Sequence, residues 1–235
     1  MKQACLYLFP TPISDGDLAE SLPEYNKEAL NLCKDFIVEN IRTSRRFLRR
    51  SDYKHSLDEV NYYELNKHSK EEDIVGYLRP IEEGRNLGLM SEAGLPCIAD
   101  PGAIIVRMAQ DKGIRVVPLV GPSSIMMALM ASGFNGQSFA FLGYIPIEKR
   151  DRSERIREIE KTMLRDNQTQ IFIEAPYRNN QLLEALINNL KPSTRICIAS
   201  DILLDSEEII TRYAKDWKKN KPDLHKRNTV FLIYK

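Results

Sequence analysis

Cysteine and histidine are few in this chain, and they are too scattered to indicate a metal centre. Its 235 residues include four cysteines, at positions 5, 33, 97 and 197, with no pair in the C-x-x-C spacing. The three histidines lie at positions 55, 68 and 225. A structural zinc site or a disulfide framework needs closer spacing. We therefore expect no metal ion and a reducing, cytoplasmic location.

Long apolar runs and an excess of one charge are also absent. The longest apolar run, residues 125–131, is far shorter than the ~20 residues of a membrane span. The apolar start at residues 4–9 ends at Pro10 and is too short for the core of a signal peptide. Lys and Arg number 34 and Asp and Glu 33, which gives a net charge of +1. We therefore expect no membrane contact, and any contact with RNA has to come from a local basic patch.

Three well-known catalytic and nucleotide-binding signatures are missing. The chain has no G-x-x-x-x-G-K-[ST] loop, which excludes a P-loop NTPase. Pro10-Thr11-Pro12 follows the first apolar run in place of G-x-G-x-x-G, and Gly121-x-Ser123 lacks the second glycine of a nucleophile elbow. The chain therefore lacks the motifs that usually accompany phosphoryl transfer, hydride transfer and acyl transfer.

Strand-like and helix-like stretches alternate along the chain. In the first half we expect strands at 4–9, 35–39, 59–64, 86–90 and 115–120, and helices at 27–32, 41–50, 69–78 and 103–111. Ser69 and Glu72 form a capping box for the third helix, which is expected to end before Pro80. Asp100 is the expected N-cap of the fourth helix.

The second half restarts the alternation after Gly121-Pro122. We expect helices at 124–131, 153–164 and 179–190, and strands at 138–142, 170–174, 195–199, 209–213 and 229–234. This pattern predicts an α/β protein of two α/β domains, 1–117 and 118–235, with mostly parallel or mixed sheets. A cofactor cleft is expected between the domains.

Two loops rich in glycine and proline carry the strongest functional signal. Residues 91–102 follow one expected strand and residues 121–124 follow the next. In an open α/β sheet, ligands bind at the carboxyl ends of the strands. The first loop also contains two carboxylates, Glu92 and Asp100, and Glu92 has no capping role that would explain it.

These loops resemble known motifs, in order along most of the chain. Residues 91–96 and 99–102 are similar to the S-D-A-G-x-P and S-D-P-G parts of the tetrapyrrole methylase superfamily signature, with Glu92 in place of Asp. Residues 116–124 resemble its V-x-P-x-P-G-P-S-A segment, with Val120 in place of a proline, and residues 172–178 resemble F-Y-E-S-P-H-R. Residues 6–13 match its opening strand and loop. The closest resemblance is to the branch that methylates a ribose 2′-hydroxyl of small-subunit ribosomal RNA.

The resemblance implies an S-adenosylmethionine-dependent methyltransferase that forms a homodimer. A helix starting at Ser124 offers free N–H groups to a carboxylate of the cofactor, and Glu174 ends a buried strand, where a charge is costly unless it is used. The family places the adenine edge near Asn228 and Thr229. The expected cofactor contacts are Pro12, Glu92, Ala93, Gly94, Pro96, Ser123, Ser124, Ile125, Glu174, Ala175, Asn228 and Thr229.

Catalysis requires alignment of the methyl donor and a base for a hydroxyl nucleophile. Glu92 and Glu39 are the expected catalytic carboxylates. On the helix at 41–50, four arginines recur at i, i+3, i+4 and i+7, which makes one basic stripe suited to RNA phosphates. These expected RNA-binding residues are Arg42, Arg45, Arg46 and Arg49.

Several segments expected to face the substrate depart from the ribosomal RNA branch. Ser14-Asp15 replaces Gly-Asn, residues 38–43 keep only Glu39 and Arg42 of a C-E-D-T-R motif, and residues 199–204 replace A-R-E-L-T-K. Three functions therefore stay open at this point. They are methylation of ribosomal RNA, methylation of a tetrapyrrole or other small molecule, and binding without turnover.

Overall fold

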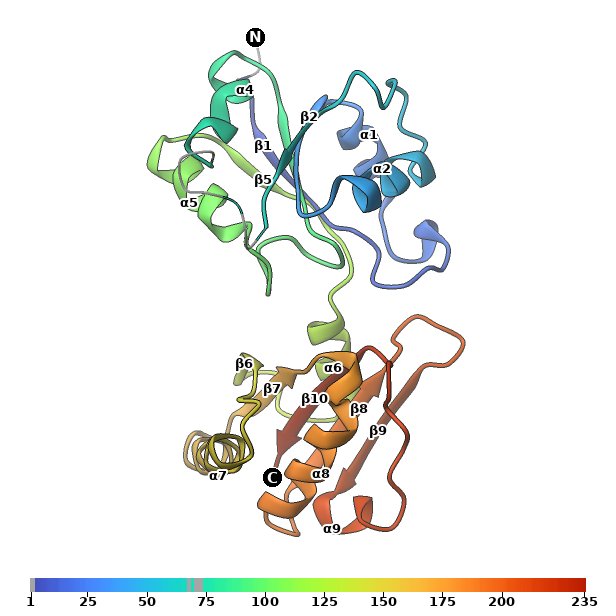
Figure 1. The fold of residues 1–235 in the computed structure, drawn as a ribbon, viewed down its shortest axis with the longest axis vertical. Helices are drawn as coiled ribbons and strands as arrows, with labels where there is room; N and C mark the ends of the chain where they lie inside the picture. Colours follow the sequence, from blue (N-terminus) through green and yellow to red (C-terminus); the bar gives the residue numbers. More distant parts are fainter. Residues whose placement is uncertain (1–2, 67–68, 70–73) are drawn as a thin grey trace. The chain divides into compact units, whose positions relative to one another are not determined.

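The computed structural model describes residues 3–66, 69 and 74–235. Its internal contacts form two compact units, Met1–Ser123 and Ser124–Lys235. Each unit is a sheet covered by helices (Figure 1), which confirms the predicted α/β class. The domain limits inferred from sequence, 1–117 and 118–235, stay a proposal.

The first unit contains a five-stranded sheet of order β3-β2-β4-β1-β5. Every pair of neighbours in it is parallel. The strands are β1 (Leu6–Phe9), β2 (Asp35–Val38), β3 (Asn61–Glu64), β4 (Leu87–Met90) and β5 (Val116–Pro118). In a parallel sheet all strands end at the same edge, so the loops after β1, β2, β4 and β5 share one edge.

Helices cover both faces of this sheet (Figure 1). Leu30 and Leu48 pack with Phe36 on the face under α1 (Glu24–Leu30) and α2 (Ile41–Arg50). Ile81 and Ile105 pack with Leu87 on the opposite face, under α4 (Arg79–Glu82) and α5 (Ala103–Asp111). Burial on both faces explains why the central strand β4 is apolar throughout. The edge strand β3 differs, because its end residues Asn61 and Glu64 are exposed. Two short 3₁₀ helices complete the unit, η1 (Leu18–Glu20) and η2 (Val75–Leu78).

The end predicted for the helix at 69–78 is wrong. The turn η2 continues directly into α4, and Pro80 lies in the first turn of α4, where its missing N–H leaves no bond unmade. At the expected start, the Ser69 hydroxyl donates to the Glu64 carbonyl oxygen at 2.9 Å. Glu72, the other half of the expected capping box, lies outside the described residues.

The second unit contains a mixed five-stranded sheet of order β6-β7-β10-β8-β9, in which only β6 and β7 are parallel. The antiparallel pairing of β8 and β9 follows the prediction from two consecutive strands. The strands are β6 (Phe139–Tyr144), β7 (Thr169–Ile173), β8 (Arg195–Ser200), β9 (Glu208–Tyr213) and β10 (Thr229–Tyr234).

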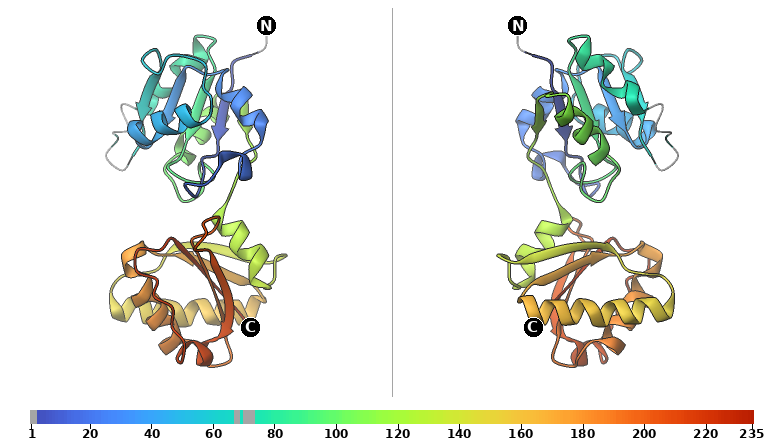
Figure 2. Two further views of the ribbon diagram at one scale, coloured as in Figure 1. Left: turned by 90° about the vertical axis from the view of Figure 1, so that its right-hand side faces the viewer. Right: turned by 90° about the vertical axis from the view of Figure 1, so that its left-hand side faces the viewer.

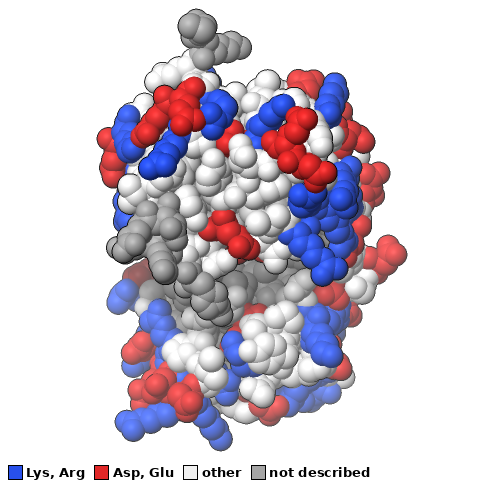
Figure 3. All heavy atoms as spheres, turned by 45° about the horizontal axis from the view of Figure 1, so that its top comes forward, with Lys and Arg blue, Asp and Glu red and all other residues white. Residues whose placement is uncertain are grey.

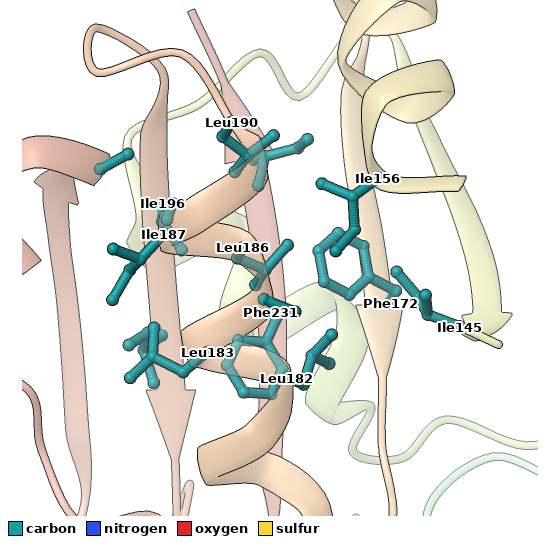
Figure 4. Close-up of a cluster of buried hydrophobic side chains, with 14 of the residues drawn as sticks. Ile145, Ile156, Phe172, Leu182, Leu183, Leu186, Ile187, Leu190, Ile196 and Phe231 are labelled. Atoms are coloured by element: carbon teal, nitrogen blue, oxygen red, sulfur yellow. The ribbon is translucent and has the colours of Figure 1, made fainter. Parts of the chain in front are cut away.

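One apolar core holds the second unit together. Leu182 and Leu186 of α8 (Asn179–Asn189) pack on the parallel rings of Phe172 and Phe231, whose centroids are 6.1 Å apart (Figure 4). Helix α7 (Lys149–Asp166) packs beside α8, whereas α6 (Ser124–Ser132) contacts β8, β9 and β10 (Figure 2). Two short helices complete the unit, η3 (Pro176–Arg178) and α9 (Ala214–Trp217).

Candidate functional site

Three loops meet at the carboxyl edge of the first sheet. Thr11, after β1, and Gly94, after β4, exchange backbone hydrogen bonds of 2.9 and 3.0 Å. Gly94 has a φ of +76°, and a Cβ there would lie 3.5 Å from the Pro122 carbonyl oxygen, in the loop after β5. Three predicted cofactor residues therefore lie at or next to this contact: Gly94 itself, Pro12 beside Thr11, and Ala93 beside Gly94.

Two side chains tie these loops to their surroundings. The Thr11 hydroxyl donates to the Ser91 carbonyl oxygen at 3.3 Å. The Asn26 amide of α1 donates to the Val120 carbonyl oxygen at 2.9 Å. Thr11 and Asn26 are both buried, so these bonds are shielded from water. These bonds join the loops after β1, β4 and β5 to their surroundings at this edge.

The two predicted catalytic carboxylates lie next to each other. The backbone N–H of Glu92 donates to Oε1 of Glu39 at 3.3 Å. Partial burial raises the pKa of Glu39; the bond from Glu92 opposes this, and the nearby charges of Asp100 and Glu92 add to it. Glu92 is exposed, and its Oε1 accepts a 2.5 Å hydrogen bond from the Thr43 hydroxyl. Sequence reasoning missed Thr43, because its contact is with a residue far along the chain.

Asp100 does not cap α5, contrary to the sequence prediction. The N-cap of α5 is Gly102. The Asp100 carboxylate accepts bonds from the backbone N–H groups of Cys97, at 2.8 Å, and Gly102, at 2.6 Å. It therefore closes the loop that precedes the helix. In this loop Cys97 and Ala99 have left-handed φ values of 70° and 61°, a conformation that costs energy in residues with a Cβ.

The arginine stripe of α2 divides into two pairs. Arg45 binds Asp58 at 2.7 Å and Arg46 binds Asp15 at 2.7 Å, so their charges are already paired within the first unit. The side chains of Arg42 and Arg49 are exposed and form no hydrogen bond or ion pair with any residue that the structure describes. Figure 3 shows Lys and Arg side chains gathered on the side of the first unit where α2 lies.

In the second unit, the structure brings Glu174 and Ala175 close to Asn228 and Thr229. Strands β7 and β10 pair Ile173 with Val230, which places the two pairs of predicted residues at neighbouring strand ends. The Asn179 amide joins these segments by donating to the Arg227 carbonyl oxygen at 2.7 Å. Ser124 begins α6, and Ile125 is buried in its first turn.

The Glu174 carboxylate is almost fully buried, and it is paired within its own segment. Oε1 accepts from the Ala175 backbone N–H at 2.7 Å and from Arg178 at 2.6 Å. Oε2 is buried and has no partner among the described residues. The ion pair with Arg178 offsets part of the free-energy cost of burying this charge.

The described parts of the chain hold neither a membrane-spanning helix nor a cluster of metal-ligating side chains. No helix there is long and apolar enough to cross a membrane. Within the same residues, no cluster of three or more His, Cys, Asp or Glu side chains is arranged to hold a metal ion.

Comparisons with known proteins identify relatives of this chain. The ribosomal RNA small subunit methyltransferase I of Escherichia coli O157:H7 is 31% identical over 207 residues, which are 88% of this chain and 68% of that protein. The protein of the same name from Bacillus subtilis (strain 168) is 34% identical over 205 residues, 87% of this chain and 66% of that protein. The chain thus spans about two thirds of the length of these relatives.

Solved structures and a family model agree with these relatives. The crystal structure of the methyltransferase CobJ matches 98% of this chain and 94% of its own chain, at 15% sequence identity. The TM-score of 0.64 shows that the two chains share the same fold. The family model for tetrapyrrole (corrin/porphyrin) methylases matches residues 18–216. The prediction of a methyltransferase is confirmed by these findings, and the chain belongs to the tetrapyrrole (corrin/porphyrin) methylase family.

Proposed function

We propose that this protein transfers the methyl group of S-adenosylmethionine to a ribose 2′-hydroxyl of small-subunit ribosomal RNA. The observation that carries the proposal is the meeting of three loops at the carboxyl edge of the first sheet, where Thr11 pairs with Gly94. The similarity to two ribosomal RNA small subunit methyltransferases supports the choice of acceptor. Because the chain spans about two thirds of those relatives, the acceptor is part of the proposal.

The chemistry of this edge suits S-adenosylmethionine. The exposed carboxylate of Glu92 can accept hydrogen bonds from ribose hydroxyls, and negative charge nearby favours a positively charged sulfonium group. Val120 and Ile98, which are 74% and 49% exposed as whole residues, offer apolar surface that an adenine ring would cover. The proposed cofactor contacts in the first unit are Pro12, Glu92, Ala93, Gly94, Pro96 and Ser123. Those predicted in the second unit stay predictions.

When bound, S-adenosylmethionine supplies an electrophilic methyl group with a neutral leaving group. The protein therefore has to hold the acceptor hydroxyl in line and to keep water out. The partly buried Glu39 carboxylate is the proposed base, because its raised pKa makes it a better proton acceptor than an ordinary glutamate. Glu92, whose backbone binds Glu39, is the neighbouring ligand contact.

The proposed RNA contact is the part of the α2 stripe that forms no ion pair with a described residue. Arg42 and Arg49 are available for phosphates, whereas Arg45 and Arg46 already bind Asp58 and Asp15. A local patch of this kind is consistent with the nearly neutral charge of the whole chain.

The proposal is tested by incubating the protein with methyl-labelled S-adenosylmethionine and small ribosomal subunits from a strain that lacks the corresponding gene. We expect label in the RNA, and a stop at one ribose when the product is mapped by primer extension. Glu39→Gln should bind S-adenosylmethionine but transfer methyl groups slowly. Label in an added tetrapyrrole but not in RNA would move the acceptor to a small molecule, and binding without transfer to either would contradict catalysis.

We also propose that the protein is a cytoplasmic homodimer. The support is the resemblance to the methylase family together with the scattered, unpaired cysteines. Light scattering on the purified protein tests the dimer, and cell fractionation tests the location.

A further inference from the structure

The Thr43 hydroxyl joins α2 to the loop after β4. Its Oγ1 lies 2.5 Å from Oε1 of Glu92, which is 49 residues later in the chain. Both side chains belong to the first unit and both are exposed. A hydrogen bond to a charged carboxylate is shorter and stronger than one between neutral groups. This contact is therefore able to hold Glu92 in one position even beside water.

Thr43 has a second acceptor within reach, the Asn40 carbonyl oxygen at 3.1 Å. One hydroxyl proton can serve only one of the two acceptors well. The Asn40 carbonyl already receives the Ser44 hydroxyl at 2.9 Å and the Ser44 backbone N–H at 3.2 Å. The Glu92 carboxylate is closer and charged, so the Thr43 proton is directed to Glu92.

The start of α2 fixes where the Thr43 hydroxyl stands. The Asn40 side chain caps the helix by accepting from the backbone N–H groups of Arg42, at 2.9 Å, and Thr43, at 3.3 Å. On the other side, the Glu92 backbone N–H is held by Glu39. Glu92 is thus held at its backbone and at Oε1, whereas Oε2 has no partner among the described residues.

We propose that Thr43 is a positioning residue that holds Glu92 so that its second oxygen, Oε2, accepts a hydrogen bond from a ribose hydroxyl of the bound ligand. The inference rests on the proposed function. A carboxylate oxygen recognises a ribose hydroxyl whether the ribose belongs to S-adenosylmethionine or to the acceptor RNA. The role of Thr43 is separate from that of the helix cap, which Asn40 provides.

The test compares Thr43→Val, which keeps the shape and removes the hydroxyl, with Thr43→Ser, which keeps the hydroxyl. Ser44→Ala is the matched control, because it removes a neighbouring hydroxyl of α2 that does not touch Glu92. Each full-length variant is titrated calorimetrically with S-adenosylmethionine, and KM for the RNA acceptor is measured at saturating S-adenosylmethionine. Melting temperatures report whether any variant is merely destabilised.

We expect Thr43→Val to weaken the binding of one of the two ligands by about fivefold, which is the effect of losing one hydrogen bond. Thr43→Ser should restore binding and Ser44→Ala should bind as the wild type does. An effect on the titration assigns the hydroxyl to S-adenosylmethionine, and an effect on KM alone assigns it to the RNA. In a Glu92→Gln background the same Thr43 substitution should add little, since the two residues act as one unit.

Unchanged binding of both ligands by Thr43→Val, in a wild-type background that binds them, would overturn this inference and leave the proposed function standing. An equal loss in Ser44→Ala would also overturn it, because the effect would then belong to the helix start. A wild-type protein that binds neither ligand would overturn the proposed function, and this inference with it.

Discussion

Gly121 packs so closely on Pro10 that a Cβ at this position would stand 2.1 Å from the Cβ of Pro10. Real Cβ atoms never approach so near, and both partners belong to loops at the carboxyl edge of the first sheet. The absence of a side chain at Gly121 thus sets the spacing between the loop after β1 and the loop after β5. This contact accounts for the glycine without any appeal to turn flexibility.

Gly121→Ala should therefore force these two loops apart. We expect a loss of about 1 to 3 kcal/mol in the free energy of unfolding, the usual cost of overpacking, together with weaker binding of S-adenosylmethionine. Urea denaturation measures the loss. Gly136→Ala is the matched control, because nothing lies within 4 Å of a Cβ there. Equal stability of the two variants would show that the close approach to Pro10 is not tight in solution.

Glu39 should make the folded protein less stable as the pH rises from about 4 towards neutrality. Its pKa is raised chiefly by burial, so between the ordinary value, about 4, and the raised one the unfolded chain ionises while the folded protein still holds the proton. Stability is then lost as the pH rises through this window. Glu39→Gln removes the ionisation, so its stability relative to the wild type should increase from pH 4 to pH 7. A constant difference over that range, measured by thermal unfolding, would argue against a raised pKa.

Arg42 and Arg49 of α2 should govern the salt dependence of RNA binding. Arg42→Ala with Arg49→Ala removes two charges that no described residue neutralises. We expect weaker RNA binding and a slope of log K against log salt that is shallower by about 1 to 2. The control is Arg150→Ala with Arg155→Ala on α7, which removes the same charge elsewhere. Identical slopes for both double variants would contradict an RNA contact on α2.

Asp100 should stabilise its loop and not the following helix. Asp100→Ala removes two hydrogen bonds to backbone N–H groups in a segment where Cys97 and Ala99 are already strained. We expect a loss of about 2 kcal/mol. Asp111→Ala, at the exposed end of α5, serves as the control and should change little. Hydrogen exchange distinguishes the sites: protection should fall at Cys97 and Gly102, whereas loss in the first turn of α5 alone would favour the helix-cap interpretation.

The sequence predicts most elements of this fold, because apolar periodicity reports which face of a segment is buried. The helix at 41–50 and the strand at 229–234 are present with those limits as α2 and β10. The short helix α9 is missed. Its four residues have no capping side chain, and it depends on Trp217, which is buried and donates to the Ile196 carbonyl oxygen at 3.1 Å. A tertiary contact of this kind leaves no local signal.

In the candidate site, too, local patterns predicted some residues, and residues that depend on tertiary contacts were missed. Motif spacing identified Glu92, Gly94 and Glu39, which the structure places at one edge of the sheet. It did not identify Thr43, whose partner is distant in sequence. It assigned Asp100 to the helix because Asp-Pro usually begins one, but here the same carboxylate reaches Cys97 and closes the loop. Local rules cannot decide between two donors that lie within three residues of one carboxylate.

The most direct test of the proposed methyl donor is a calorimetric titration of the full-length protein with S-adenosylmethionine, repeated with Glu92→Gln. We expect saturable binding by the wild type, a higher melting temperature with ligand, and weaker binding by the variant. No detectable heat and no thermal shift for the wild type would contradict the proposed methyl donor and the site at the carboxyl edge of the first sheet.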